Sequence, residues 1–186
     1  MKKLNHSEIL KQRKSVTEMK QVNRHPFVVL LNNLRSMHNV GSVFRTSDSA
    51  CIEKVYITGY TATPPREEID KTALGATETV EWEYIKSATE CVQRLKDQGY
   101  FICGLEHTQT SENFYNFHLP DQKLCLILGN EVFGVDQELL DMCDAHIEIP
   151  MYGMKHSLNV SVAYGISIFE LVKKHREKQK IINNFT

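Results

Sequence analysis

Three clusters of polar residues could bind or transform a ligand, and each follows an apolar run that is typical of a buried strand. They are Asn39 with Arg45, the segment from Gly129 to Glu131, and Ser157 with Asn159. In open α/β sheets, ligands bind beyond the carboxyl ends of the strands. We therefore expect the three clusters to meet at one edge of a sheet and to form a site for a polar ligand.

The third cluster belongs to a segment that runs from Ile147 to Ala163. Its first residues, 147–149, form a β-type run, and Pro150 ends it because proline lacks the amide hydrogen that a sheet requires. After a turn that contains glycine, Ser157 stands where a helix N-cap is expected, and Asn159 would lie one residue inside that helix. Free backbone groups at this turn could bind polar parts of a small ligand. A capped core helix, with Asn159 satisfying a local backbone group, is an equally good interpretation.

Several familiar catalytic patterns are missing from the sequence. Gly129 and Gly134 have the glycine spacing of a phosphate-binding P-loop, but Val135 and Asp136 follow where Lys and Ser or Thr are required. The chain has no G-x-G-x-x-G after a predicted strand and no G-x-S-x-G, which argues against ordinary dinucleotide binding and against a nucleophile elbow. The eight histidines lack the spacing of metal ligands. We expect neither a nucleoside triphosphatase nor a metal site.

Length and composition predict one soluble globular domain. The chain has 186 residues, of which 41% are hydrophobic and 24% are charged, so it can bury a substantial core. No apolar run approaches the roughly 20 residues that a membrane helix needs, and the first residues lack the apolar core of a signal peptide. We therefore expect a cytoplasmic protein without a membrane partner. The five cysteines are scattered and lack C-x-x-C pairs, which favours reduced thiols in the core.

Charge is distributed unevenly along the chain. The net charge is −1, but residues 1–25 carry +5 and residues 171–186 carry +4, so the part between them carries −10. Basic ends on an acidic body could grip the phosphates of a nucleic acid, or they could be solvated termini. We predict a basic, helical N-terminal extension over residues 1–25 and a basic, polar tail over residues 175–186.

Hydrophobic periodicity predicts alternating strands and helices. Strands are expected at residues 27–31, 55–58, 80–84, 100–105, 124–128 and 147–149. Residues 37–49 are expected to be a loop that runs into a helix, and further helices are expected within residues 7–22 and at residues 71–75, 87–98, 136–143 and 158–172. Ser15 and Asp136 are the expected N-caps of two of these helices, and Gly99 is expected just after the end of a third. The alternation favours an α/β fold with a mainly parallel sheet flanked by helices, and periodicity alone would give a flavodoxin-like sheet.

Three stretches of the chain resemble motifs 1, 2 and 3 of the SpoU (TrmH-like) RNA 2′-O-ribose methyltransferases, a family of the SPOUT superfamily. They are NLRSMHNVGSVFRT at residues 33–46, LGNEVFGV at residues 128–135 and IPMYGMKHSLNVSVA at residues 149–163. The segment KTALGA at residues 71–76 also recurs in such proteins. The resemblance covers about residues 26–174. It implies a SpoU-type methyltransferase domain over these residues, with a C-terminal trefoil knot.

The same resemblance implies a cofactor, partners and site residues. The cofactor would be S-adenosylmethionine, the substrate would be tRNA or rRNA, and the enzyme would act as a homodimer through the knot region. The implied cofactor-binding residues are Leu105, Glu106, Gly129, Asn130, Ile149, Met151, Ser157 and Leu158. The implied catalytic residues are Asn39, Arg45, Glu131, Ser157 and Asn159. The methyl group would face Asn39 and Arg45 of the same subunit or of its partner.

The chemistry of arginine limits what Arg45 can do. A guanidinium has a pKa above about 12, so it is a poor general base at neutral pH. A clamp on the phosphate beside the reacting ribose, which also stabilises the developing alkoxide, explains an arginine equally well. Glu131, Ser157 and Asn159 would then orient the ribose or Arg45.

Two other functions are compatible with parts of the sequence. One is a non-catalytic, knotted protein that binds RNA or assists assembly, although three intact motifs argue against it. The other is an unrelated α/β enzyme that acts on a small phosphorylated molecule and has no affinity for RNA.

The apolar character of residues 158–172 agrees with a homodimer, because it extends almost all round the predicted helix. Such a helix is covered on two sides, either by a second copy of the chain or by its own core.

Overall fold

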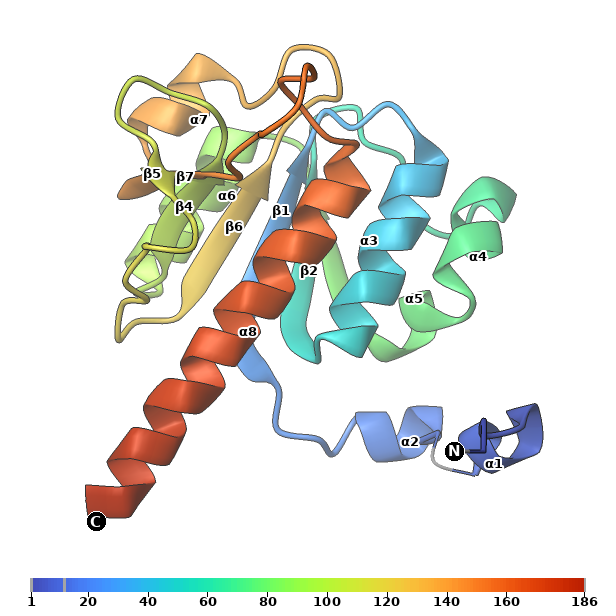
Figure 1. Cartoon of the computed structure of the whole chain (residues 1–186). Coiled ribbons are helices and arrows are strands. Elements are labelled where there is room, and N and C mark those ends of the chain that lie inside the picture. The colour runs from blue at the N-terminus through green and yellow to red at the C-terminus, as the bar shows by residue number, and fades with distance from the viewer. Residues whose placement is uncertain (1, 12, 186) are drawn as a thin grey trace.

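A parallel sheet of seven strands forms the centre of the molecule (Figure 1). The computed structural model describes residues 2–11 and 13–185. The strands are β1 His25–Asn32, β2 Ile52–Thr58, β3 Glu81–Ile85, β4 Phe101–Leu105, β5 Glu112–Asn113, β6 Leu124–Leu128 and β7 Ala145–Glu148. Their order in the sheet is β3-β2-β1-β6-β4-β7-β5, and neighbouring strands run parallel. The predicted α/β fold with a mainly parallel sheet is confirmed.

Two predictions about the sheet are wrong. The order is not flavodoxin-like. A flavodoxin-like sheet places β1 between β2 and β3, whereas here β1 lies between β2 and β6. Residues 106–122, for which the sequence predicts no strand, contain β5, in which Glu112 pairs with Ile147 of β7. A strand of two residues has no periodicity, so its position depends on the partner strand and not on its own sequence.

Apolar residues of β1 face both sides of the sheet. Phe27, Val29 and Leu31 belong to one buried cluster, and Val28 and Leu30 belong to a second. The first cluster is completed by residues of two helices, Val40, Val43, Phe44, Tyr164, Ile168 and Leu171, and the second by Cys91, Val92 and Leu95 of a third helix. The near-continuous apolar run that predicted this strand is therefore the mark of a strand buried on both faces.

Helices cover both faces of the sheet (Figure 1). They are α1 His6–Leu10, α2 Val16–Met19, α3 Met37–Ser49, α4 Glu67–Ala73, α5 Ala76–Thr79, α6 Ala88–Asp97, α7 Gln137–Asp141 and α8 Val160–Phe185. The predicted capping box is confirmed, since the Ser15 side chain accepts from the Glu18 N–H and the Glu18 carboxylate accepts from the Ser15 N–H. Gly99 follows the end of α6 with a φ of 81°, as predicted. No helix in the described part of the chain is both long enough and apolar enough to cross a membrane.

Asp136 does not cap α7 in the way that was expected. It occupies the N-cap position, but its side chain makes no capping hydrogen bond. Its Oδ2 instead accepts from the side-chain amides of Asn32, at 2.6 Å, and Asn33, at 3.1 Å. Asn32 is the last residue of β1 and Asn33 follows it, so the carboxylate links the carboxyl end of β1 to the segment after β6.

Helix α8 begins two residues later than expected, and Asn159 caps it instead of Ser157. The Asn159 Oδ1 accepts from the Ser161 N–H at 2.9 Å, and the Asn159 carbonyl accepts the helical bond from the Ala163 N–H at 2.9 Å. Ser157 is exposed and precedes the helix. Serine and asparagine are equally good N-caps, so the local sequence could not choose between them.

Three contacts position α3, which begins at the edge of the sheet beyond β1. The Ser36 hydroxyl accepts from the Asn39 N–H and caps the helix. Gly41 lets α3 pack closely on α4, because a Cβ at this position would lie 2.2 Å from the carbonyl oxygen of Ile69. The Ser47 and Tyr164 hydroxyls share a buried hydrogen bond of 2.7 Å that joins α3 to α8. Asn39 is therefore held in the first turn of a fixed helix.

The basic ends of the chain lie at the end of the sheet opposite the carboxyl ends of the strands (Figure 1). Helix α8 begins near the carboxyl ends of the strands and continues to residue 185 (Figure 1). It therefore passes through the predicted boundary between residues 174 and 175. Lys174 donates to the carbonyl oxygens of Tyr115 and Phe117, so this lysine holds the 106–122 segment. Residues 1, 12 and 186 of the predicted extension and tail lie outside the described residues, and the predicted domain boundaries stay predictions.

Acidification is expected to destabilise the packing of α8 on β1. The His175 ring lies 5.5 Å from the His25 ring and 5.6 Å from the Phe27 ring. Burial lowers the pKa of both histidines, and nearby positive charge, from His175 and Arg176 for His25 and from Lys178 for His175, lowers it further. The unfolded chain then binds more protons than the folded chain, so the free energy of unfolding should fall as pH drops below about 6.5, the ordinary pKa of histidine.

Urea unfolding of the wild type and of the variant His25→Phe/His175→Phe between pH 5 and pH 8 would check this expectation. The wild type should lose stability below pH 6.5 more steeply than the double variant. Equal slopes for the two proteins would contradict it.

Candidate active site

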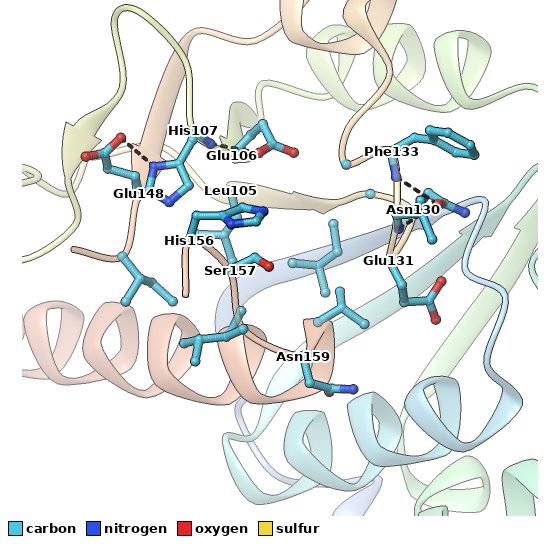
Figure 2. A pocket seen from close by; sticks show the side chains of 18 of the residues that line it. Leu105, Glu106, His107, Asn130, Glu131, Phe133, Glu148, His156, Ser157 and Asn159 are labelled. Carbon is cyan, nitrogen blue, oxygen red and sulfur yellow. Dashed lines mark hydrogen bonds and ion pairs between the residues drawn. The ribbon is translucent and has the colours of Figure 1, made fainter. Parts of the chain in front are cut away.

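A pocket of about 590 Å³ opens at the carboxyl ends of β4, β6 and β7, beside the first turn of α8. Its volume lies within the range of ordinary small-molecule sites. Apolar side chains of Leu105, Leu128, Ile149, Met151, Leu158, Val160 and Ala163 form part of the wall, and Glu106, His107, Asn130, Glu131, Glu148, His156, Ser157 and Asn159 provide polar groups (Figure 2). The site therefore offers an apolar surface and several polar groups in one cavity.

The structure places most of the predicted site residues on this pocket. The eight residues predicted to bind a cofactor line it: Leu105, Glu106, Gly129, Asn130, Ile149, Met151, Ser157 and Leu158. Of the predicted catalytic residues, Glu131, Ser157 and Asn159 line the pocket, and Asn39 is hydrogen-bonded to two of them. Arg45 is the exception. The roles assigned to these residues remain predictions.

One directed chain of hydrogen bonds joins the three polar clusters. The Asn39 Nδ2 donates to the Glu131 Oε1 at 2.9 Å, and the Asn159 Nδ2 donates to the Asn39 Oδ1 at 3.1 Å. The carboxylate can only accept and the backbone N–H of Ser161 can only donate, so both amides have a single possible orientation. The expected convergence of the clusters is confirmed for Asn39, Glu131 and Asn159, but not for Arg45.

Glu131 also holds the start of α3. Its two oxygens accept from the backbone N–H groups of Arg35, at 2.8 Å, and Ser36, at 3.0 Å. Partial burial acts to raise the pKa of Glu131, but the hydrogen bonds from Arg35, Asn39 and Ser36 outweigh it and lower the pKa below its ordinary value. A carboxylate in this state is a weak proton acceptor. Its geometry suits a residue that positions Asn39.

The loop after β6 is closed by backbone contacts. The N–H and carbonyl groups of Asn130 and Gly134 pair with each other at 2.8 and 2.9 Å. A Cβ on Gly129 would lie 2.2 Å from the backbone of Gly134 and Val135, so only glycine fits there. The Glu106 Oε2 accepts from the Val135 N–H at 2.9 Å and ties this loop to the end of β4. The pocket therefore has a preformed backbone wall.

Sequence reasoning missed a second polar group on the opposite side of the pocket (Figure 2). The His107 Nδ1 lies 3.0 Å from the Glu148 Oε2, which also accepts from the Ser111 hydroxyl. These hydrogen bonds lower the pKa of Glu148. His107 and Glu148 are 41 residues apart in the chain. Because β4 and β7 pair only through long-range contacts, no local pattern could have brought them together.

Arg45 lies outside the pocket of its own chain. It is exposed on α3, six residues after Asn39, and it is not among the residues that line the cavity. Within the described residues, its side chain makes no hydrogen bond or ion pair. The three acidic side chains of the wall, Glu106, Glu131 and Glu148, face no lysine or arginine from the same wall. An anionic ligand that approaches this pocket needs positive charge from elsewhere.

Among the described residues, no group of three or more His, Cys, Asp or Glu side chains is arranged to hold a metal ion.

Comparison with known proteins identifies related sequences. The pattern of the SpoU rRNA Methylase family matches residues 26–169. A protein of the TrmH family of tRNA/rRNA methyltransferases in Staphylococcus epidermidis is 29% identical over 163 residues, which cover 88% of this chain and 65% of that protein. A Staphylococcus aureus protein of the same description is 30% identical over 154 residues, which cover 83% and 61%. The chain thus spans about three fifths of the length of these relatives.

Solved structures share the fold. The TrmH/SpoU tRNA modifying enzyme of A. aeolicus is 28% identical, with a TM-score of 0.78 over 92% of this chain and 86% of that one. The SpoU methyltransferase AviRb from Streptomyces viridochromogenes, solved in complex with AdoMet, is 22% identical. It has a TM-score of 0.76 over 83% of this chain and 63% of its own. At 22% identity, the similarity to AviRb shows a shared fold and nothing more.

Proposed function

Because the chain belongs to the SpoU rRNA methylase family, we propose that it transfers a methyl group from S-adenosylmethionine to a ribose 2′-hydroxyl of tRNA or rRNA. The observation that carries this proposal is the hydrogen-bonded chain from Glu131 through Asn39 to Asn159. It unites segments that follow three different strands at the rim of one pocket. Such an arrangement fits a site that must hold two reactants in a fixed relative position.

The residues of the pocket fit this cofactor. Apolar side chains such as Ile149, Met151 and Leu158 can enclose an adenine, while the closed loop from Gly129 offers backbone groups to polar atoms. The carboxylates of the wall favour a ligand that carries a sulfonium and an ammonium group. When bound, S-adenosylmethionine supplies an activated methyl group.

The residues of the chain would contribute orientation and charge. Methyl transfer to oxygen requires the hydroxyl oxygen to lie in line with the methyl carbon and the bond that breaks, about 3 Å from that carbon. Asn39 and Asn159, fixed by Glu131, would hold the ribose in this position. The lowered pKa of Glu131 argues against a role as the base. The proton would leave to water as Arg45 stabilises the developing alkoxide and the adjacent phosphate.

The proposal includes a homodimer in which Arg45 of one copy serves the pocket of the other. Arg45 is exposed outside its own pocket, whose wall lacks lysine and arginine. Helix α8 exposes Val162, Ile166 and Phe169 at a spacing that places them on one stripe. A second copy that covered this stripe would bury apolar surface next to α3. The C-terminal trefoil knot belongs to the same proposal, and the supporting observation is the shared fold of the related enzymes.

Two assays test the proposed function. S-adenosylmethionine is titrated into the pure protein by calorimetry, and labelled methyl transfer is measured into separated tRNA and rRNA. Saturable binding and transfer into one RNA fraction are expected. Binding without transfer to either fraction would favour a non-catalytic RNA-binding or assembly protein. Binding of neither cofactor nor RNA would contradict the proposal.

The variant Gly129→Ala is expected to abolish cofactor binding. The added methyl group would lie 2.2 Å from the backbone of Gly134 and Val135, so the loop must open. We expect at least a 100-fold loss of affinity for S-adenosylmethionine and a loss of stability of about 1–3 kcal/mol, as overpacking usually costs. Calorimetry and urea unfolding measure the two effects.

The matched control is Gly153→Ala, in the turn before α8, where an added Cβ meets no atom within 4 Å. This control should bind the cofactor as the wild type does. Wild-type affinity in Gly129→Ala would show that the loop does not form the cofactor site.

A further inference from the structure

An aromatic side chain with no structural role lies at the mouth of the pocket. Phe133 is 83% exposed, although it belongs to the closed loop after β6. Figure 2 shows its ring directed away from His156 and Ser157 at the centre of the pocket. The ring therefore does not pack in the core, and Phe133 lines the outer part of the pocket. Val132, its neighbour in the chain, is also 62% exposed, and an exposed apolar patch at the rim of a polar site marks a surface that contacts a partner.

The backbone that carries this ring is fixed by Asn130. The Asn130 Oδ1 accepts from the N–H groups of Val132, at 2.8 Å, and Phe133, at 3.0 Å. The Asn130 Nδ2 donates to the carbonyl oxygen of Asn33 and to the hydroxyl of Tyr60, both at 2.8 Å. Each polar atom of this amide is thus occupied by holding a neighbouring segment. The loop presents Phe133 at a low cost in conformational entropy.

The same amide is hydrogen-bonded to a second exposed aromatic residue. Tyr60 follows β2 and is 62% exposed, while its hydroxyl is tied to Asn130. Two aromatic side chains from different loops therefore adjoin one asparagine at the mouth of the site. The stripe that a second copy would cover lies on α8. It consists of the aliphatic Val162 and Ile166 and of one aromatic residue, Phe169. Aromatic rings set among amide groups are instead typical of surfaces that stack nucleobases.

We propose that Phe133, on a loop that Asn130 also ties to the exposed Tyr60, stacks against an unpaired base of the substrate RNA, and this inference rests on the proposed function. A 2′-hydroxyl enters a pocket most readily when its nucleotide is unpaired, and unpaired nucleotides are also the ones whose bases stack on aromatic side chains of proteins. The face of an aromatic ring replaces part of the lost base stacking. Since every base has such a face, this contact binds the nucleotide without reading its identity.

Three substitutions at one position separate stacking from simple apolar contact. Phe133→Ala and Phe133→Leu remove the aromatic face, whereas Phe133→Tyr keeps it. The first two variants should raise the KM for RNA roughly 5- to 100-fold, as expected for one lost stacking contact. Phe133→Tyr should stay within about 3-fold of the wild type, a margin smaller than one stacking contact. The affinity for S-adenosylmethionine should change by a much smaller factor than the KM for RNA, because Phe133 is 83% exposed at the outer part of the pocket.

A fluorescence titration tests the same contact without turnover. The sequence has one tryptophan, Trp82, so Phe133→Trp adds a single new fluorophore at the mouth of the pocket. Its emission should be quenched on titration with bulk tRNA or rRNA, in excess of the change seen for the wild type. Quenching without methyl transfer would uphold the stacking surface and refute the proposed function.

Other results would overturn the inference. A wild-type KM for RNA in Phe133→Ala, or no additional quenching in Phe133→Trp, would exclude a stacking role. A wild-type KM for RNA in Phe133→Leu would show that the contact is apolar packing and not stacking. A change in oligomeric state for Phe133→Ala, measured by sedimentation, would show that a second copy covers this ring.

Discussion

Replacing Arg45 with alanine is expected to lower turnover by at least about 100-fold, the usual cost of removing one group that stabilises developing negative charge. The affinity for S-adenosylmethionine should not change, because Arg45 does not line the pocket. Its side chain is exposed, so the free energy of unfolding should stay within about 0.5 kcal/mol of the wild type. Single-turnover methyl transfer, calorimetry and urea unfolding measure these three quantities.

Mixed dimers determine which subunit supplies this arginine. Arg45→Ala retains an intact pocket, and Gly129→Ala retains Arg45, so each is expected to be inactive alone. If the arginine crosses to the partner, co-refolding the two variants should restore activity in the mixed dimer. If Arg45 serves its own pocket, mixing restores nothing. Full activity of Arg45→Ala alone would show that the residue has no part in the reaction.

The second large effect is expected for Glu131→Ala, which should reduce turnover by about 100-fold or more and destabilise the protein by about 1–3 kcal/mol. Two backbone N–H groups, from Arg35 and Ser36, would lose their acceptor, and Asn39 would lose the partner that orients it. The loss should not add to that of Asn159→Ala, since both act through Asn39. A double-mutant cycle of kcat and of unfolding free energy measures this coupling.

The pH profile of Glu131→Gln separates a positioning residue from a general base. Because the hydrogen bonds to Glu131 keep it ionised well into acid, its titration should not appear in the profile near neutral pH. Glu131→Gln should therefore retain part of the activity, with the same pH dependence as the wild type. An exposed carboxylate of α4, Glu68, offers the matched control Glu68→Gln, which should be neutral. Complete loss together with a changed profile would identify Glu131 as the base.

Local sequence was sufficient for every described strand except β5 and for the position of the site. Residues 27–31 and 124–128 are apolar throughout, and both are strands buried on two faces. The polar residues that follow such strands meet because parallel strands end at one edge, as Asn39, Glu131 and Asn159 show. These predictions depend only on the hydrophobic periodicity of the strands and on the polar residues that follow them.

Other features depend on partners that are distant in the chain. Ser157 and Asn159 are equally suited to cap α8. In the structure Asn159 is the cap, and its side chain also donates a hydrogen bond to Asn39. Asp136 lies at an N-cap but accepts from two amides at the carboxyl end of β1. The pairing of His107 with Glu148 arises from the long-range contact of β4 with β7. Such contacts become predictable only when the order of the strands is known.

The most direct test of the account is to identify the methylated atom. RNA that has been incubated with the protein and labelled S-adenosylmethionine is digested to nucleosides and analysed by mass spectrometry, with Arg45→Ala as the control. The account predicts a methyl group on the ribose fragment of one nucleoside, present for the wild type and nearly absent for the variant. A methyl group on a base fragment, or equal ribose methylation by both proteins, would contradict it.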